Sequence, residues 1–479
     1  MRILMVASEA MPFAKTGGLA DVVSALPRAL VRLGHAVDVV IPRYRGITAG
    51  DRVARVAVPL GTSVTDADIY AVTSAGVRTL FVDHPAYFDR ECLYGVGNED
   101  YADNAARFAF LARAAVEWAA AAGERYAVVH AHDWQTGLVP LLLRHTMAGA
   151  AAFRGVPAIF TIHNLAYQGL FETSWLPRLG LEWELLHVDA IEFWGRISFL
   201  KAGIVFGSRI TTVSPQYARE IQTPEFGFGF DGILRSRSAH LSGILNGIDY
   251  DEWDPARDRH LPVPYDASRL DGKDAAKRLV LELVGLPADD EGRRRPLVGM
   301  ISRLVDQKGF DLLADLGDEL PRLDASFVLL GSGERRYEDV WRNLAARHPQ
   351  RIAVRIGFDE AMAHRIEAGA DVFLMPSRFE PCGLNQMYSL RYGTVPVVCA
   401  TGGLCDTVRN VDPATGEGTG FTFGDCSPPA LLAALRRALD AYRHRPVWRR
   451  IQAAGMAQDF SWESSARQYA ALYERAYNK

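Results

Sequence analysis

The chain has 479 residues, enough for two large domains or about three average ones. Apolar residues make up 49% and charged residues 23%, as in ordinary globular domains, which excludes a disordered or fibrous protein. The formal net charge of −4 excludes a bulk electrostatic attraction to nucleic acid or to anionic lipid. No apolar run reaches the ~20 residues that a membrane-spanning helix needs.

The N-terminus and the cysteines predict a protein of the reducing cytoplasm. Residues 1–9 begin like a signal peptide, but Glu9 and Lys15 interrupt the pattern, which is more typical of a first buried strand. The five cysteines are few, odd in number and widely spaced, and nothing about them resembles a disulfide framework or a zinc ligand set. They are Cys92, Cys382, Cys399, Cys405 and Cys426.

The first half of the chain alternates short apolar runs with segments of helical spacing. We expect strands at 3–7, 37–41, 79–82, 127–130, 158–162 and 209–213. We expect helices at 19–33, 101–122 and 136–145. Continuous apolar strands separated by helices predict a parallel sheet that is covered on both faces.

A stretch rich in turn-forming residues, 245–255, interrupts this alternation, which restarts at Pro296. We expect strands at 297–301, 326–330, 352–357, 372–375 and 395–399, and helices at 275–284, 311–319, 337–347 and 429–444. The sequence therefore predicts two doubly wound α/β domains that face an interdomain cleft. In such sheets ligands bind beyond the carboxyl ends of the strands.

The loop after the first strand reads Lys15-Thr-Gly-Gly-Leu-Ala-Asp21. Gly17 and Gly18 permit a close approach of the backbone to a ligand, and the following helix N-terminus suits a phosphate. Its spacing fits neither a Walker A motif nor a dinucleotide fingerprint. An ordinary βα turn with glycines for packing is the alternative.

Polar residues also end two further strands of the first half. The segment His130-Ala-His-Asp-Trp134 contains a histidine pair that could bind a metal, but no second cluster supplies more ligands, so a hydrogen-bonded pair is the expectation. Asp133 is then a polar group at the edge of the sheet. His163 and Asn164 occupy the equivalent place after the next strand.

In the second half, Arg303 and Lys308 follow the strand at 297–301. An arginine fork and a compact lysine charge both suit a diphosphate, although a solvated basic loop is the alternative. Glu380 follows the strand at 372–375, and we expect Gly383 to open a helix there. A carboxylate at that place can accept hydrogen bonds from sugar hydroxyls or act as a helix cap.

A second glycine pair follows the strand at 395–399, in Thr401-Gly-Gly-Leu-Cys-Asp406. Taken together, these motifs resemble those of bacterial glycogen synthases and plant starch synthases, which are retaining glucosyltransferases of glycosyltransferase family 5 with the GT-B fold. The resemblance rests on seven motifs that span nearly the whole chain in order. They are 15–21, 130–134, 161–164, 245–249, 302–309, 377–383 and 401–404.

The resemblance implies roles for the matching residues. Arg303 and Lys308 would hold the diphosphate, and Glu380 would line the donor glucose together with Asp133, His163 and Asn246. Tyr388 would lie near the nucleoside, where many relatives with this fold carry a second glutamate. Further substrate contacts would come from Lys15, Gly17, Gly18, Asp21, Asn164, Cys382, Gly383, Leu384, Thr401 and Gly402. Tyr94, Asn104 and Arg107 are candidates for acceptor contacts.

The implied domains are 1–246 on the acceptor side, 247–458 for the nucleotide sugar, and a helix at 459–479 that packs back on the first domain. The implied reaction is transfer of glucose from ADP-glucose to the non-reducing end of an α-1,4-glucan, with no cofactor, no metal, no nucleic acid and no membrane. UDP-glucose is the alternative donor, and a glucan phosphorylase or a non-catalytic glucan-binding protein are rival classes. For the mechanism, we favour attack by the acceptor hydroxyl on the same face of the sugar from which the phosphate departs. The alternative is a double displacement in which Asp133 attacks from the opposite face. The sequence indicates no oligomeric state.

Overall fold

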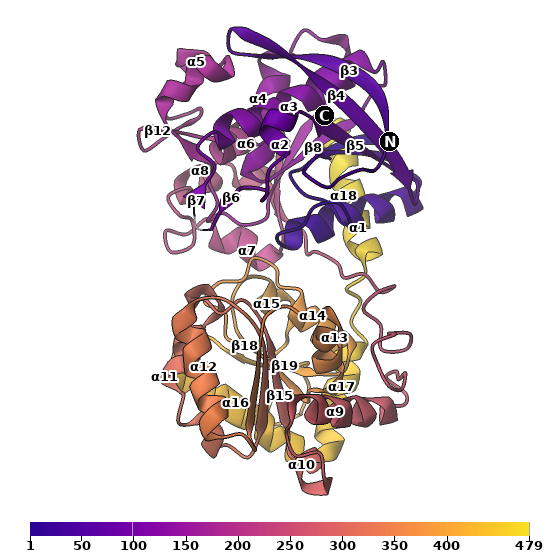
Figure 1. Ribbon diagram of the computed structural model, residues 1–479, viewed down its shortest axis with the longest axis vertical. Helices are drawn as coiled ribbons and strands as arrows, with labels where there is room; N and C mark the ends of the chain where they lie inside the picture. Colours follow the sequence, from indigo (N-terminus) through magenta and orange to yellow (C-terminus); the bar gives the residue numbers. More distant parts are fainter. Residues whose placement is uncertain (98, 479) are drawn as a thin grey trace. The chain divides into compact units, whose positions relative to one another are not determined.

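The computed structural model describes residues 1–97 and 99–478 of the chain. It forms two compact units (Figure 1). The N-terminal unit comprises residues 1–213, 218–247 and 462–479, and the C-terminal unit comprises residues 214–217 and 248–461. The chain thus passes into the C-terminal unit after Gly247 and returns at Trp462, next to the junctions that the sequence proposed at 246 and 458.

A nine-stranded sheet forms the centre of the N-terminal unit, in the order β14-β13-β9-β8-β1-β2-β5-β4-β3. The strands from β14 to β5 are parallel, as the apolar runs predicted. Their bounds are β1 Arg2–Val6, β2 Ala36–Pro42, β5 Val77–Asp83, β8 Val128–His132, β9 Ala158–Ile162, β13 Arg209–Thr212 and β14 Leu241–Gly243.

The long hairpin of β3 (Asp51–Leu60) and β4 (Ser63–Ser74) was not predicted, and it makes this sheet mixed rather than wholly parallel. Both strands are largely exposed, so they lack the continuous apolar run of the other strands. The signal that was present is an alternation of period two, in which Val56 and Val58 are buried while their neighbours are not. Such alternation is typical of an antiparallel strand with one covered face.

Helices cover the faces of this sheet. Near the N-terminus, α1 and the C-terminal helix α18 pack on each other and on β1 and β2, with Leu26, Tyr469 and Tyr473 in the shared core. Figure 1 shows α18, in yellow, beside the indigo α1. The bounds are α1 Gly18–Arg32, α2 Pro85–Phe88, α3 Asn104–Ala121, α4 Leu138–Arg144, α5 Leu176–Leu179, α6 Phe199–Phe206, α7 Pro215–Glu220, α8 Asp231–Ser236 and α18 Trp462–Tyr477. Short strands β10 Leu170–Phe171, β11 Glu192–Phe193 and β12 Arg196–Ser198 form a small separate sheet, and β6 Gly95–Val96 pairs with β7 Glu99–Asp100.

The C-terminal unit has a six-stranded, wholly parallel sheet in the order β17-β16-β15-β18-β19-β20. The predicted strands of the second half are all present; β20 was not predicted. The strands are β15 Leu297–Ile301, β16 Ser326–Gly331, β17 Ile352–Ile356, β18 Val372–Met375, β19 Val395–Cys399 and β20 Phe421–Phe423. The helices are α9 Asp271–Val284, α10 Asp290–Arg294, α11 Phe310–Asp315, α12 Arg335–Arg347, α13 Glu360–Gly369, α14 Asn385–Arg391, α15 Gly402–Thr407, α16 Pro428–Arg443 and α17 Arg445–Met456.

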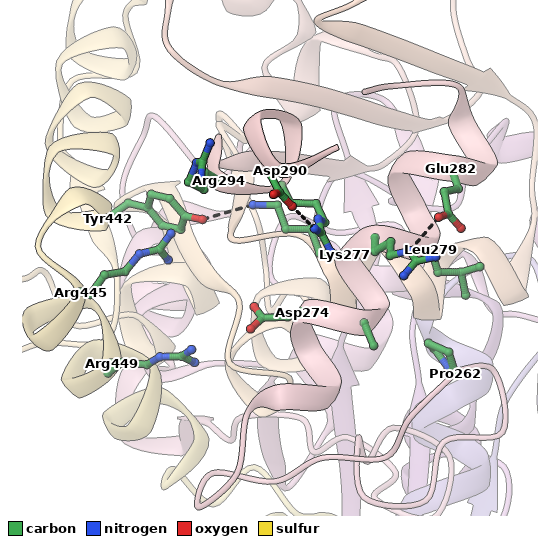
Figure 2. Close-up of a pocket in the computed structure, with 13 residues that line it drawn as sticks. Pro262, Asp274, Lys277, Leu279, Glu282, Asp290, Arg294, Tyr442, Arg445 and Arg449 are labelled. Carbon is green, nitrogen blue, oxygen red and sulfur yellow. Dashed lines mark hydrogen bonds and ion pairs between the residues drawn. The ribbon is translucent and has the colours of Figure 1, made fainter. Parts of the chain in front are cut away.

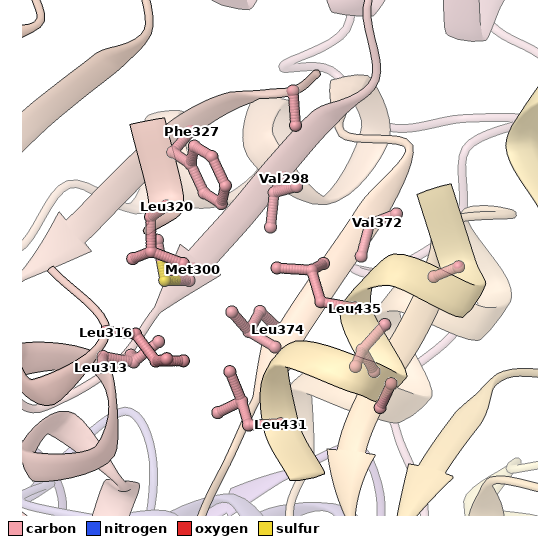
Figure 3. Close-up of a cluster of buried hydrophobic side chains, with 14 of the residues drawn as sticks. Val298, Met300, Leu313, Leu316, Leu320, Phe327, Val372, Leu374, Leu431 and Leu435 are labelled. Atoms are coloured by element: carbon pink, nitrogen blue, oxygen red, sulfur yellow. The ribbon is translucent and has the colours of Figure 1, made fainter. Parts of the chain in front are cut away.

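The core of this unit shows why its strands read as unbroken apolar runs. Met300 of β15 and Leu374 of β18 meet Leu431 and Leu435 of α16 on one face (Figure 3). A second buried cluster, which includes Val328 and Ile366, lies on the opposite face. Both faces are therefore covered, and the prediction of a doubly wound α/β architecture is confirmed.

The expectation that nothing about the cysteines resembles a disulfide framework is wrong for one pair. Cys399, at the end of β19, and Cys426, just after β20, are joined in a disulfide with their Cα atoms 6.1 Å apart. The pairing of two neighbouring parallel strands brings together cysteines 27 positions apart in sequence, which their spacing alone did not indicate. In the part of the chain that the structure describes, no helix is long and apolar enough to cross a membrane.

Candidate active site

The predicted site residues form two groups, one in each unit, and each group lies at the carboxyl ends of parallel strands. In the N-terminal unit β1 lies between β8 and β2, so the strand order reverses there. In the C-terminal unit β15 lies between β16 and β18 in the same way. Such switch points open a crevice between the loops that leave neighbouring strands in opposite directions.

Glu9 organises the loop after β1, and the sequence analysis gave it no role in the site. Its carboxylate is 3% exposed and accepts hydrogen bonds from the Thr16 hydroxyl at 2.7 Å, from the Gly17 N–H at 3.4 Å, and from the Thr16 N–H. The Tyr94 hydroxyl donates to the same carboxylate. A carboxylate two residues after the predicted strand at 3–7 was the signal available in the sequence. Glu9 thus fixes the backbone that presents Gly17 and Gly18.

Lys15 and Asp21 lie on the surface of this loop and form an ion pair of 2.7 Å. Gly17 is the N-cap of α1, and Gly18 is its first residue. The N–H groups of the first turn of a helix lack partners within the helix and attract anions. The loop therefore has the chemistry predicted for a phosphate contact, with a lysine held in place by Asp21.

Asp133 occupies a conformation that side chains rarely adopt, with φ at +58°. It follows β8, and its Oδ1 accepts a hydrogen bond of 2.7 Å from the His163 N–H at the end of β9. Burial raises the pKa of Asp133 to about 7, against the lowering effect of the N–H groups of His163 and Asn164. A strained, half-buried carboxylate that titrates near neutral pH is typical of a functional position.

The histidines of β8 and the one after β9 hydrogen-bond to their neighbours, as expected for His130 and His132. Both ring nitrogens of His130 have hydroxyl partners, Tyr473 at 2.8 Å and Thr161 at 2.6 Å. His132 Nδ1 lies 3.0 Å from Nε2 of His163. Burial lowers the pKa of His163 to about 3, so its imidazole is neutral at physiological pH and can exchange hydrogen bonds with a hydroxyl.

Two asparagines complete the group in the N-terminal unit. Asn164 follows His163, and its Oδ1 accepts a hydrogen bond of 3.0 Å from the Ala166 N–H. Asn246 is buried, and its Oδ1 has no hydrogen-bond partner. A buried acceptor without a partner costs about 1–3 kcal/mol unless a bound group donates to it. Asn246 therefore points to a ligand hydroxyl.

In the C-terminal unit, the loops after β15 and β18 bring Lys308 and Glu380 together. Lys308 Nζ lies 2.5 Å from Glu380 Oε2, and the Ser377 hydroxyl donates to the same oxygen at 3.0 Å. The two loops are tied by their backbones, since the Arg378 N–H donates to the Gln307 carbonyl at 2.9 Å. Arg303 is exposed, and no described residue forms an ion pair with its guanidinium. The loops thus combine Lys308, whose charge Glu380 balances, with Arg303, whose charge no described residue balances by an ion pair.

The glycines after β18 and β19 serve close backbone packing. A Cβ on Gly402, whose φ is +45°, would lie 1.9 Å from the Glu380 carbonyl oxygen. The Gly403 N–H donates to that same carbonyl at 3.0 Å. The expectation that Gly383 opens a helix is wrong, because α14 begins at Asn385 and Gly383 lies in the preceding turn with φ at +71°. Gly402 and Gly403 thereby hold the Glu380 loop in position.

The remaining predicted residues of this unit flank the same loop. Cys382 is buried, and Leu384 is the N-cap of α14. The ring of Tyr388 stacks on Trp253 with centroids 3.8 Å apart, so part of its surface is covered by the chain itself. That Tyr388 lies beside the nucleoside of a bound donor remains a prediction.

Phe358 is a residue that the sequence analysis missed. It follows β17 at the same edge of the sheet, and its side chain is 91% exposed, more than any other large apolar side chain described. An exposed ring at the ligand-binding edge of a sheet offers a stacking surface for a planar group. An aromatic residue directly after a predicted strand was the available signal.

The three residues suggested for acceptor contacts make hydrogen bonds within the N-terminal unit, and the acceptor contact stays a prediction for each of them. Arg107 is fully buried and donates to the carbonyls of Tyr87 and Leu93 at 2.7 and 3.0 Å. Asn104 is buried and donates to the Tyr94 carbonyl at 2.9 Å. A further bond of 2.7 Å joins Arg107 Nη1 to Asn104 Oδ1, whereas Nη2 of Arg107 is buried with no hydrogen-bond partner among the described residues.

The cavity drawn in Figure 2 contains none of the predicted site residues. It measures about 940 Å³ and lies within the C-terminal unit between α9, α10 and the paired helices α16 and α17. Arginines and a lysine dominate its lining, and Lys277 donates to the Tyr442 hydroxyl at 3.2 Å. It is therefore a cavity separate from the predicted site.

The chain is similar to known proteins along its whole length. Residues 2–236 match the family described as the starch synthase catalytic domain, and residues 289–453 match the glycosyl transferases of group 1. A glycogen synthase from Anaeromyxobacter sp. is 54% identical over 99% of both chains, and one from Koribacter versatilis is 48% identical over 99% of this chain and 98% of the other. The catalytic domain of starch synthase IV from Arabidopsis thaliana, solved with ADP and acarbose, has a TM-score of 0.90 at 36% identity, covering 100% of this chain and 99% of that chain.

Proposed function

The chain belongs to the family of bacterial glycogen synthases and plant starch synthases and has its GT-B fold, and from this premise we propose the reaction and the residues that perform it. The protein is a glucosyltransferase that moves glucose from ADP-glucose to the non-reducing end of an α-1,4-glucan with retention of configuration. The observation that carries this proposal is the arrangement of Arg303, Lys308 and Glu380 at the switch point of the C-terminal sheet.

The leaving group sets the first chemical demand. As the bond between the anomeric carbon and the phosphate oxygen breaks, negative charge grows on the diphosphate while the sugar ring becomes positive. Arg303 and Lys308 stabilise the diphosphate, and each fixed donor of this kind is worth about 3 kcal/mol in a transition state. Because Glu380 already holds Lys308 by an ion pair of 2.5 Å, the ammonium is positioned before the donor binds.

The sugar sets the second demand. The acceptor hydroxyl attacks the anomeric carbon from the face that the phosphate leaves, and its proton passes to the departing phosphate oxygen. His163 and Asn246 offer a neutral imidazole and an unpaired carbonyl oxygen for the hydroxyls of the glucose. Asp133 lies beside the reacting sugar and balances the positive charge of the ring. The His163 N–H donates to Oδ1 of Asp133 and holds the carboxylate in place. A carboxylate held in this way suits electrostatic stabilisation of the sugar better than nucleophilic attack on it.

The nucleobase requires a flat apolar surface. The exposed ring of Phe358 follows β17, on the same edge of the sheet as Arg303. We assign it to stacking on the base, while Tyr388 lies closer to the ribose. Stacking of a base on an aromatic ring contributes about 1–3 kcal/mol and does not distinguish one base strongly from another.

The decisive experiment measures nucleotide release and glucan elongation with ADP-glucose and UDP-glucose over one glucan primer. We expect ADP release matched by glucan elongation, which Arg303→Ala abolishes. Arg335→Ala is the matched control, because it removes another exposed arginine of the same unit that has no proposed role. Faster turnover of UDP-glucose would reassign the donor. Glucose 1-phosphate formation from glucan and phosphate, with a pyridoxal absorbance band, would identify a phosphorylase.

A further inference from the structure

A histidine and two glutamates to which no role is assigned above gather in the C-terminal unit, next to Trp253, whose ring also stacks on Tyr388. Glu360 and His364 are four positions apart on α13, which places them on one face of the helix. Glu252 comes from the irregular segment between Ile248 and α9. One ligand atom from each of the three lies within 4.8 Å of the other two.

His364 is prepared to bind through Nε2. Its side chain is 1% exposed, and its Nδ1 lies 2.7 Å from Asp258 Oδ2, which also accepts a hydrogen bond of 2.6 Å from the Tyr392 hydroxyl. Because a carboxylate only accepts, Nδ1 carries a proton, and the lone pair of the neutral imidazole is then on Nε2. That Nε2 atom is buried and has no hydrogen-bond partner in the part of the chain that the structure describes. A carboxylate behind the imidazole is the usual support of a metal-binding histidine.

The imidazole ring is also held in orientation. Trp253 stacks on it with centroids 3.7 Å apart and an interplanar angle of 10°. The ring therefore cannot turn to find another acceptor or donor for Nε2. A buried lone pair that the fold keeps unpaired is an independent indication of a ligand at this place.

The two glutamates supply negative charge that the protein leaves unbalanced. Among the described residues, no lysine or arginine forms an ion pair with Glu252 or Glu360. Both side chains are exposed, so they can rotate by the ångström or so that would bring their oxygens to the 2.0–2.2 Å bond lengths of a zinc ion.

We propose that Glu252, Glu360 and His364 form a binding site for a divalent transition metal ion of the Zn²⁺ type. One imidazole and two carboxylates make a three-ligand set that leaves a fourth position to water. The ion joins the segment at Glu252 to α13 and so stabilises the C-terminal unit. The proposal is independent of the glucosyl transfer, because none of the three residues takes part in it.

The test is isothermal titration of the EDTA-dialysed full-length chain with Zn²⁺, alongside the visible spectrum of the Co²⁺-loaded chain as a direct report of coordination. The variant is Glu252→Gln/Glu360→Gln, which removes two ligands at the surface. The matched control is Glu182→Gln/Glu184→Gln, which makes the same charge change on two exposed glutamates of the N-terminal unit. Thermal melting without metal checks that all three proteins are folded.

We expect one Zn²⁺ to bind per chain and the melting temperature to rise on binding. The visible spectrum of the Co²⁺-loaded chain should show the absorbance of a cobalt ion with a low coordination number. Affinity should fall at least ~100-fold in Glu252→Gln/Glu360→Gln, since loss of even an outer-shell partner costs 10–100-fold. The control should bind as the wild type does. The absence of stoichiometric binding, or equal binding by variant and control, would overturn the proposal.

Discussion

Lys308 and Glu380 form a 2.5 Å ion pair that connects the loops after β15 and β18, with the lysine side chain 19% and the glutamate side chain 8% exposed. The pair lies where the strand order of the C-terminal sheet reverses. Arg303, from the same loop as Lys308, has no such partner among residues 1–97 and 99–478. The two cations proposed for the diphosphate therefore differ in what they do for the folded protein, and this difference can be measured.

Arg303→Ala and Lys308→Ala should each lower turnover by about 100- to 1,000-fold, as removal of one fixed donor does elsewhere. Only Lys308→Ala should also lower the melting temperature, because it leaves the Glu380 carboxylate buried without its cation. Steady-state kinetics and melting curves on the same preparations check both effects, with Arg335→Ala as the control. Near-wild-type turnover in either variant at saturating donor would refute the assignment to the diphosphate.

Glu380→Gln should lower turnover at least ~100-fold and change donor KM less, because the carboxylate acts on charge that develops in the transition state. Glutamine can still accept hydrogen bonds from Lys308 and Ser377, so the melting temperature should stay within a few degrees. If turnover remained within a factor of about two while the melting temperature fell sharply, Glu380 would have a structural role only.

Asp133→Asn should raise the melting temperature by a few degrees at pH 8 and leave it nearly unchanged at pH 4. The pKa of Asp133 rises from 3.8 to about 7 in the folded chain, so between these values the folded state holds a proton that the unfolded state has lost. The stability of the wild type therefore falls as pH rises through this window, and the cost is fully present above pH 7. Asparagine keeps the acceptor for the His163 N–H without the charge.

Melting curves of wild type and Asp133→Asn from pH 4 to pH 8 check this linkage. The difference between them should widen as pH rises. A difference that is constant across the range would mean that Asp133 is ionised throughout. Turnover of the variant, measured at pH 8, separately reports whether the charge serves the reaction.

Phe358→Ala should raise the KM for the donor about 10-fold and change kcat little, because lost stacking weakens binding of the ground state and the transition state alike. Phe358→Tyr should restore the KM, since it keeps the ring. The melting temperature should not change, because the side chain is 91% exposed. An unchanged donor KM in Phe358→Ala would show that the base binds elsewhere.

Much of the fold could be predicted from the sequence. The strands at 297–301 and 372–375 are covered on both faces, so their residues are uniformly apolar and stand out in the sequence. Lys15, Asp133, Arg303 and Glu380 each lie in the segment that follows a buried strand, and the rule that ligands bind at the carboxyl ends of parallel strands singled them out as candidates. The exposed hairpin of β3 and β4 lacks such a run and was missed.

Only the tertiary structure decided which of these residues meet and what supports them. Glu9 reaches Thr16 across the loop after β1, Gly402 approaches the Glu380 carbonyl from another strand, and Cys399 pairs with Cys426. His364 has an unpaired Nε2 because Asp258 and Trp253, more than 100 positions earlier, fix its ring. The periodicity of a sequence reports burial along one element, whereas these contacts depend on the distance between elements, which the packing of the whole unit sets.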